Sequence, residues 1–241
     1  MHKQPTIGVL GGMGPLATLD LLHKILVETP AMRDQDHVPT LTWNVPQIPD
    51  RQKALAGIGE SPLSAMLDGI SKLNAAGATR IAIPCNTAHF WFEELQAGSC
   101  VPIIHIADAT MNALKKLKIA SPCVGLIATQ GTLNAQLYQD RLNTLNIPFV
   151  TNTEQEFLDL FTPGCYAIKQ GQLDRGGHLL QAAAECLVQQ GATILILACT
   201  EVPLGLAHIN STFLEMSIDP TRALASECVA YWQEHRVQEE A

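Results

Sequence analysis

The chain is poor in aromatic residues and in positive charge. Phe, Trp and Tyr make up 5% of its 241 residues, and 15 Lys and Arg stand against 23 Asp and Glu, which gives a net charge of −8. A nucleic-acid-binding surface normally needs a basic stripe, so this balance argues against general binding of DNA or RNA. A site for an anionic ligand must be built from a few placed cations and from backbone amides.

Long apolar runs are also missing, because charged residues, Pro or Gly interrupt each one. A membrane-spanning helix needs about 20 consecutive apolar residues, so no membrane span is predicted. The first residues, 1–5, lack the apolar region of a signal peptide. The seven cysteines show no disulfide-framework spacing, which is typical of a reducing compartment. We therefore expect a cytoplasmic protein.

Apolar residues nevertheless make up 47% of the chain, which indicates a well-buried globular protein. Strand-like and helix-like patterns alternate along it. Strands are expected at residues 6–10, 40–45, 102–106 and 124–128, and helices at 15–27, 62–76, 108–117 and 222–234. Alternating strands and helices predict an α/β fold with parallel sheets flanked by helices on both faces.

The second half of the sequence repeats the first. Gly77-Ala78-Thr79 leads into an apolar run that ends at Cys85, and Gly191-Ala192-Thr193 leads into one that ends at Cys199, 114 positions later. The repeat predicts two pseudo-symmetric α/β lobes, the first formed by residues 1–104 with 217–241 and the second by residues 105–216. Ligands of open α/β sheets bind beyond the carboxyl ends of the strands, so both cysteines are expected in a cleft between the lobes.

Cys85 and Cys199 differ from the other cysteines in their shared setting. A lone cysteine is usually a packing residue, and we interpret the remaining five in this way: Cys100, Cys123, Cys165, Cys186 and Cys228. A thiol at a strand end, just before a helix, meets unpaired N–H groups and the positive end of a helix dipole, which stabilise a thiolate. Each of the two thiols is therefore well placed to act as a thiolate.

Two opposed thiols suit acid–base chemistry at one carbon atom. One thiolate can remove a proton while the other, still a thiol, delivers a proton to the opposite face, which inverts that carbon. A nucleophilic hydrolase would instead need a histidine paired with a cysteine, and His89 is the only near candidate.

Two other kinds of site fit the sequence less well. Gly12-Met13-Gly14-Pro15-Leu16-Ala17 fits the G-x-G-x-x-A pattern of a dinucleotide site, but the next predicted strand does not end in an acidic residue. Cys85, His89 and His105 lack the clustered spacing of a four-ligand metal site. No cofactor and no metal are predicted.

The motifs around the two cysteines resemble the aspartate/glutamate racemase family. The matching segments are Pro84-Cys85-Asn86-Thr87-Ala88-His89, Ala198-Cys199-Thr200-Glu201, Gly11-Gly12-Met13-Gly14-Pro15 and Asp108-Ala109-Thr110. The resemblance extends from Ile7 to about Thr221 and is greatest to the aspartate racemases. It implies a two-lobe α/β fold and racemisation of an acidic amino acid by a thiol/thiolate pair without pyridoxal phosphate.

The resemblance also implies roles for individual residues. It makes Cys85 and Cys199 the catalytic pair, and it implies substrate contacts from further positions: Met13, Arg51, Asn86, Thr87, Thr129, Thr132, Lys169, Thr200 and Glu201. Arg51 and Lys169 are the expected cationic partners of the second carboxylate. Glu201 either orients the thiol of its neighbour or caps a helix. Members of the family often pair, so a homodimer is also expected.

Three alternatives stay open on the sequence alone. A related lyase or isomerase, similar to a maleate isomerase or a decarboxylase, could use the same cleft on small dicarboxylates. A non-catalytic module could bind an amino acid. A redox protein could join Cys85 to Cys199 in a disulfide. The preference between aspartate and glutamate is also open.

Overall fold

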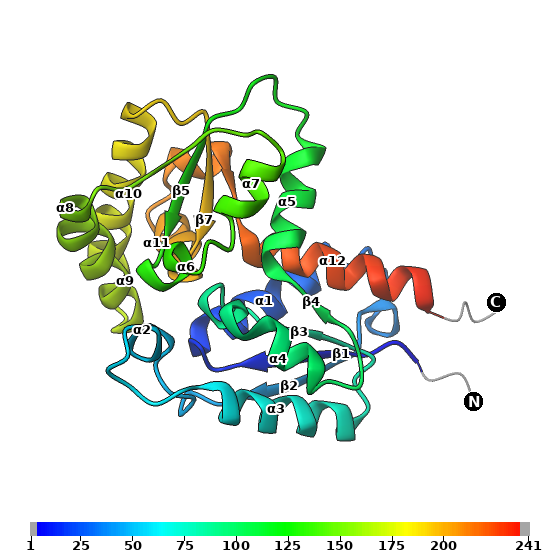
Figure 1. The fold of residues 1–241 in the computed structure, drawn as a ribbon. Helices are drawn as coiled ribbons and strands as arrows, with labels where there is room; N and C mark the ends of the chain where they lie inside the picture. Colours follow the sequence, from blue (N-terminus) through cyan, green and yellow to red (C-terminus); the bar gives the residue numbers. More distant parts are fainter. Residues whose placement is uncertain (1–3, 237–241) are drawn as a thin grey trace. The chain divides into compact units, whose positions relative to one another are not determined.

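The structure, a computed structural model, describes residues 4–236 (Figure 1). It divides into two compact units, one formed by the chain up to Ala109 and from Thr221 onward, the other by Thr110–Pro220. The sequence-based borders, after residues 104 and 216, lie a few positions earlier. The predicted first lobe also includes residues 1–3 and 237–241, which lie outside the described residues.

The first unit is built on a parallel sheet of four strands in the order β2-β1-β3-β4. The strands are β1 (Ile7–Gly11), β2 (Thr40–Asn44), β3 (Arg80–Ala82) and β4 (Ile103–Ile104). The helical segments are α1 (Pro15–Glu28), η1 (Asp34–Asp36), α2 (Arg51–Leu55), α3 (Leu63–Ala76), η2 (Thr87–Trp91), α4 (Phe92–Ala97) and α12 (Pro220–His235). Helix α5 (Ile106–Lys116) begins in this unit and ends in the next.

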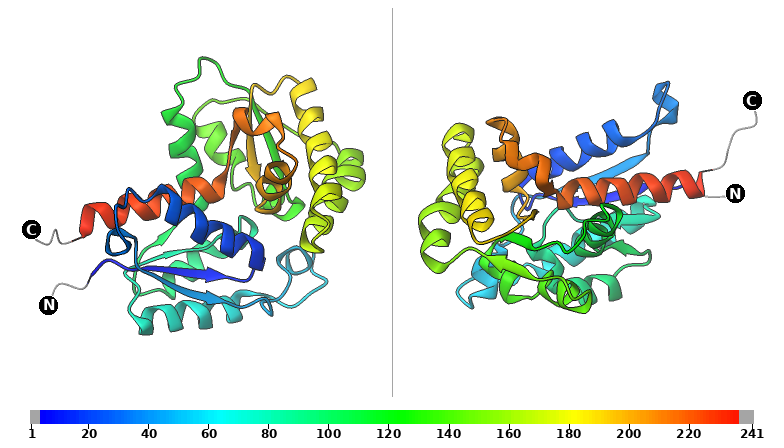
Figure 2. Two further views of the ribbon diagram at one scale, coloured as in Figure 1. Left: turned by 180° about the vertical axis from the view of Figure 1, so that it is seen from behind. Right: turned by 90° about the horizontal axis from the view of Figure 1, so that it is seen from above.

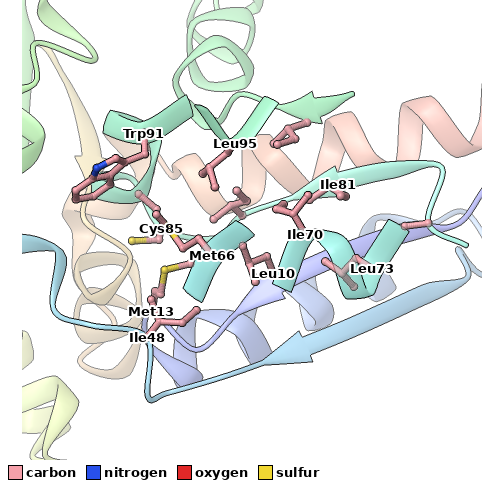
Figure 3. Packing of buried hydrophobic residues seen from close by; sticks show 14 residues of the cluster. Leu10, Met13, Ile48, Met66, Ile70, Leu73, Ile81, Cys85, Trp91 and Leu95 are labelled. Carbon is pink, nitrogen blue, oxygen red and sulfur yellow. The ribbon is translucent and has the colours of Figure 1, made fainter. Parts of the chain in front are cut away.

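The central strand β1 is buried on both faces of this sheet, whereas the edge strand β2 is largely exposed. Side chains of β1, β3 and α3, including Leu10, Ile70 and Ile81, form a cluster on one face (Figure 3). On the other face α1 packs together with α12, and the two helices lie side by side in Figure 2. An ion pair between Arg222 and Glu28, 3.0 Å long, joins these two helices. The C-terminal helix thus returns to the first sheet, as the sequence predicts.

The second unit repeats this plan with a parallel sheet in the order β6-β5-β7-β8. Its strands are β5 (Val124–Ala128), β6 (Phe149–Thr151), β7 (Ile194–Ala198) and β8 (Ser217–Ile218). Its helical segments are α6 (Gln130–Asn134), α7 (Gln139–Thr144), α8 (Glu154–Glu156), η3 (Phe157–Phe161), α9 (Thr162–Lys169), α10 (Leu173–Gln189), α11 (Glu201–His208) and η4 (Thr212–Met216). The matching strand orders confirm the predicted duplication and fold class.

The two strands that precede the cysteines differ in where they end relative to the cysteine. β3 ends at Ala82, three positions before Cys85, whereas β7 runs up to Ala198, directly before Cys199. Pro84 has no backbone N–H to give to a neighbouring strand, which accounts for the early end of β3. The expected strand at 102–106 is reduced to β4, because α5 already begins at Ile106.

Within residues 4–236, none of the helices combines the length and apolar character that crossing a membrane requires.

Candidate active site

The loop after β1 is fixed by its glycines and by Thr18. Gly12 has a φ of 98°, and a Cβ on it would lie 2.3 Å from the carbonyl oxygen of Val45. The Thr18 hydroxyl accepts a hydrogen bond from the Gly12 N–H at 2.9 Å and donates one to the Gly14 carbonyl at 3.2 Å. The Met13 side chain is buried.

Cys85 lies at the edge of the hydrophobic cluster of the first unit. Figure 3 shows its side chain beside those of Met13 and Met66. The Cys85 N–H donates to the Ile83 carbonyl at 2.8 Å, which turns the chain after the strand. Asn86 then starts the short helix η2. The predicted helix start is present, and its first part is a 3-10 segment that continues directly into α4.

His89 binds the backbone on both sides of its ring. Its Nδ1 lies 2.9 Å from the Cys85 carbonyl oxygen, and its Nε2 lies 3.2 Å from the Ile106 N–H. A nitrogen that faces a carbonyl must carry the proton, and one that faces an N–H must not. His89 is thus the neutral tautomer with Nδ1–H. It holds the Cys85 backbone in place and is not a base for the thiol.

Arg51 opens helix α2, which is capped by the Asp50 carboxylate through the N–H groups of the next turn. The Arg51 Nη1 donates to the carbonyls of Ile48 and Pro49 at 3.2 and 3.0 Å. Its Nε is buried and has no hydrogen-bond partner among residues 4–236. This buried N–H is therefore unsatisfied within the described residues.

Gln52 is a residue of this site that the sequence did not reveal. Its Nε2 donates to the Thr87 hydroxyl at 3.0 Å and so joins α2 to the helix that follows Cys85. Gln52 comes directly after Arg51, and that position was the only signal in the sequence. The contact positions Thr87, which the resemblance assigns to substrate binding.

Cys199 follows β7 and meets a second cysteine. Its sulfur lies 3.7 Å from the sulfur of Cys165 on α9, and both side chains are buried. The sequence interpretation of Cys165 as a packing residue is therefore incomplete, because its thiol touches a catalytic candidate. Cys165 lies four residues before Lys169, on the same face of the helix. That spacing was the available signal.

Glu201 bridges the Cys199 thiol and a cation. Its Oε2 accepts hydrogen bonds from the Cys199 thiol at 3.1 Å and from the Thr200 hydroxyl at 3.2 Å. Its Oε1 lies 3.7 Å from the Nζ of Lys169, the last residue of α9. Of the two roles left open for Glu201, this geometry supports orientation of the thiol.

Thr129 and Thr132 form the cap of helix α6. The Thr129 hydroxyl accepts a hydrogen bond from the Thr132 N–H at 3.2 Å and donates one to the Thr132 hydroxyl at 2.9 Å. Thr132 is completely buried. The loop after β5 therefore has a defined local structure, like the equivalent loop after β1.

Comparison with known proteins decides the family of the chain. The model of the Asp/Glu/Hydantoin racemase family matches residues 10–228. The chain belongs to this family. It is an amino-acid racemase, and the predicted family, fold class and enzyme class are confirmed.

Several relatives of this racemase are known. A broad-specificity amino-acid racemase of Bacillus subtilis is 29% identical over 233 residues, which cover 93% of this chain and 96% of the relative. The aspartate racemase of Picrophilus torridus is 29% identical with a TM-score of 0.83, over 95% of this chain and 94% of that one. A glutamate racemase of Francisella tularensis, 18% identical with a TM-score of 0.72 over 100% and 86% of the chains, shares the fold.

The racemase keeps Cys199 protonated at rest. The hydrogen-bonding contact with Cys165, burial and the negative charge of Glu201 raise the pKa of Cys199 well above that of an ordinary thiol, while the Lys169 ammonium opposes the shift. The expectation that a helix N-terminus makes Cys199 a thiolate is thus wrong for the resting state. The contact with Cys165, burial and the charge of Glu201, which is itself the first residue of α11, all act against ionisation of the thiol.

The described residues of the racemase contain no group of three or more His, Cys, Asp or Glu side chains arranged to hold a metal ion. His89, the nearest imidazole to Cys85, already uses both ring nitrogens for backbone contacts. A metal at Cys85 would have to break one of these hydrogen bonds to take His89 as a ligand.

Proposed function

We propose that this racemase inverts the α-carbon of an acidic amino acid, aspartate first and glutamate as the close alternative, with the thiols of Cys85 and Cys199 and without pyridoxal phosphate. In this proposal one of the two thiols faces each side of the substrate α-carbon. The observation that carries the proposal is the Cys199 thiol held by the Glu201 carboxylate at the end of β7, at the position that Cys85 occupies in the first unit.

The proton transfers follow from this arrangement. In one direction the Cys85 thiolate removes the α-proton, and the Cys199 thiol gives its proton to the opposite face of the carbanion-like carbon. Cys85 ends as a thiol and Cys199 as a thiolate, which is the starting state for the reverse direction. The raised pKa of Cys199 makes it the proton donor of the resting enzyme.

Glu201 serves both halves of this cycle. Its carboxylate accepts the Cys199 S–H and fixes the direction of the proton, so the donor is already oriented before the substrate arrives. After the transfer, the same negative charge lies beside a new thiolate and makes it a stronger base for the reverse reaction. Lys169 limits this repulsion because its ammonium pairs with the far oxygen of the carboxylate.

Two cations support an acidic substrate. The α-carboxylate needs one set of donors, and a second carboxylate needs a cation of its own in a protein with net charge −8. Arg51 has a buried Nε without a partner among residues 4–236, and the Lys169 side chain is 48% exposed. The name of the Picrophilus torridus relative, an aspartate racemase, agrees with this choice of substrate.

An isotope experiment tests the reaction. Each enantiomer of aspartate and glutamate is incubated with the enzyme in D₂O, and α-deuterium and enantiomeric composition are followed by NMR and chiral chromatography. We expect wash-in and inversion for aspartate, and loss of inversion in both Cys85→Ser and Cys199→Ser. Cys100→Ser, at an exposed cysteine, should match wild type. Retention of every α-hydrogen in all four amino acids would exclude the racemase mechanism.

A further inference from the structure

The second thiol beside Cys199 has no part in the proton transfers described above. We propose that Cys165 and Cys199 form a peroxide-sensitive dithiol, in which hydrogen peroxide or an organic hydroperoxide joins the two sulfurs in a disulfide and a small dithiol restores them. Formation of the disulfide is a property of the two thiols alone. The accompanying loss of activity rests on the proposed function, because that function makes Cys199 catalytic.

The geometry needs only a small movement. The two sulfurs are 3.7 Å apart, and a disulfide bond is about 2.05 Å long, so an approach of roughly 1.7 Å closes it. Small rotations of both side chains can supply this approach. Both thiols lie in one hydrophobic cluster with Phe161, Leu180 and Val202, which keeps them facing each other. The backbone of α9 need not unfold.

Helix α9 is held close to its neighbours, which preserves this proximity. A Cβ on Gly176 of α10 would lie 2.9 Å from the Gly164 carbonyl of α9, so α10 and α9 approach at backbone distance. A Cβ on Gly205 of α11 would lie 3.0 Å from Ile168 of α9. Glycines at these positions let α9 pack tightly, and Cys165 is carried on the packed face.

The pair is distinct from the other cysteines. All seven cysteines are free, and no other two of their sulfurs lie within hydrogen-bonding distance of each other in residues 4–236. Cys186, on α10 of the same unit, is partly buried, and burial and Glu156 raise its pKa. It therefore offers a thiol of similar type without a sulfur neighbour.

The chemical steps balance. The Cys199 thiolate attacks one oxygen of the peroxide and the O–O bond breaks, which gives a sulfenic acid at Cys199. The leaving alkoxide, or the hydroxide from hydrogen peroxide, takes a proton from the solvent and departs as an alcohol or as water. The Cys165 sulfur then displaces the hydroxyl group, its proton leaves with that group as water, and the S–S bond forms. Two thiols lose two electrons and the peroxide gains them.

Turnover is expected to accelerate the reaction of Cys199 with peroxide. The resting Cys199 is a thiol, which reacts slowly with peroxide, whereas the thiolate left after proton donation reacts fast. Substrate should thus accelerate disulfide formation. The disulfide removes the donor proton and blocks the catalytic sulfur. It also protects that sulfur from further oxidation to the sulfinic acid, which a dithiol cannot reverse.

Peptide mapping tests the proposal directly. The full chain is treated with hydrogen peroxide, with and without aspartate, then digested without reduction and analysed by mass spectrometry. We expect a cross-linked pair of peptides that contains Cys165 and Cys199, its yield several-fold higher with aspartate, and activity that dithiothreitol restores. Absence of that cross-link in protein that peroxide has inactivated overturns the proposal.

Two variants separate the dithiol from other causes of inactivation. In Cys165→Ser, peroxide should still stop the enzyme, but dithiothreitol should no longer restore activity, because Cys199 proceeds to the sulfinic acid. Cys165→Ala serves the same purpose if the serine variant fails to fold. Cys186→Ser should behave like wild type in both the cross-link and the recovery. Full recovery of the Cys165 variants with dithiothreitol contradicts the proposal.

The same experiment distinguishes failure of the dithiol from failure of the racemase. Mapping of the disulfide needs no turnover, so a protein without racemase activity can still show the Cys165–Cys199 cross-link after prolonged peroxide treatment. A protein that incorporates deuterium at the α-carbon of aspartate but never forms the cross-link contradicts the dithiol proposal. The racemase mechanism is then unaffected.

Discussion

The Glu201 carboxylate accepts a hydrogen bond from the Cys199 thiol at 3.1 Å, and both side chains are buried. A carboxylate next to a buried thiol disfavours the thiolate, because the two negative charges repel each other in a poorly solvated site. The same contact fixes where the thiol proton points. The pair thus combines the two properties that a proton donor needs, a retained proton and a fixed direction.

Replacing Glu201 by Gln tests this pair. Glutamine keeps the size of the side chain and an acceptor oxygen but removes the negative charge, so the pKa of Cys199 should fall. In the direction where Cys199 donates, activity is lost as the thiol ionises, and this descending limb should move to lower pH. We expect kcat to drop about 10- to 100-fold, within the range of general acid–base contributions.

The pH–rate profile in both directions is the decisive measurement. In the reverse direction Cys199 is the base, so its ascending limb should also move to lower pH. Glu185→Gln, at an exposed position on α10 of the same unit, is the matched control and should leave both limbs in place. Limbs that stay unchanged in Glu201→Gln would show that the carboxylate does not control the Cys199 proton.

His89 supports Cys85 through the backbone, which leads to a stability prediction. His89→Phe keeps a ring in the buried site but removes the two hydrogen bonds that the imidazole makes, one with the Cys85 carbonyl and one with the Ile106 N–H. Loss of one partner from a buried hydrogen bond costs about 1–3 kcal/mol, so the free energy of unfolding should fall by about 2–6 kcal/mol. Urea unfolding measures it, with His208→Phe at a more exposed position as control. A fall below about 0.5 kcal/mol would contradict the backbone role.

The duplication made much of this fold predictable. Matching apolar runs before Cys85 and Cys199 indicated two lobes, and the strand orders β2-β1-β3-β4 and β6-β5-β7-β8 agree with that. Hydrophobic periodicity is a local property, so the sequence can reveal it. The lengths of β3 and β4 were less predictable, because they depend on Pro84 and on the early start of α5.

The partners of the site residues were harder to predict. Cys165 meets Cys199 only because α9 packs against α11, the helix that begins just after Cys199, and nothing close in sequence joins the two cysteines. Gln52 meets Thr87 across 35 positions for the same reason. The sequence motif did indicate Glu201 as a partner of the Cys199 thiol, because the two residues are only two positions apart. Tertiary contacts of polar side chains leave no periodic signal, so sequence reasoning misses them.

Arg51 provides a test of substrate class. Its buried Nε lacks a partner among residues 4–236, and a charge-assisted hydrogen bond to a substrate carboxylate contributes about 1.5–3 kcal/mol. Arg51→Met should therefore raise KM for aspartate about 10- to 100-fold while any turnover of alanine, which has no second carboxylate, stays within about 3-fold. Arg175→Met, at an exposed arginine, should change neither. Equal losses on aspartate and alanine would assign Arg51 a structural role only.

Gly12 provides a test of the first substrate loop. Its φ of 98° disfavours any L side chain, and a Cβ there would lie 2.3 Å from the Val45 carbonyl oxygen. Gly57 has a φ of 72° with nothing within 4 Å, so Gly57→Ala carries backbone strain without a clash. We expect Gly57→Ala to lower the free energy of unfolding by about 1–2 kcal/mol, and Gly12→Ala by a further 1–3 kcal/mol or so for the collision. Gly12→Ala should also lower kcat for aspartate, because the loop must move away from Val45. Denaturant unfolding and the racemisation assay measure both effects, and equal losses of stability in the two variants would show that the close approach to Val45 does not constrain the loop.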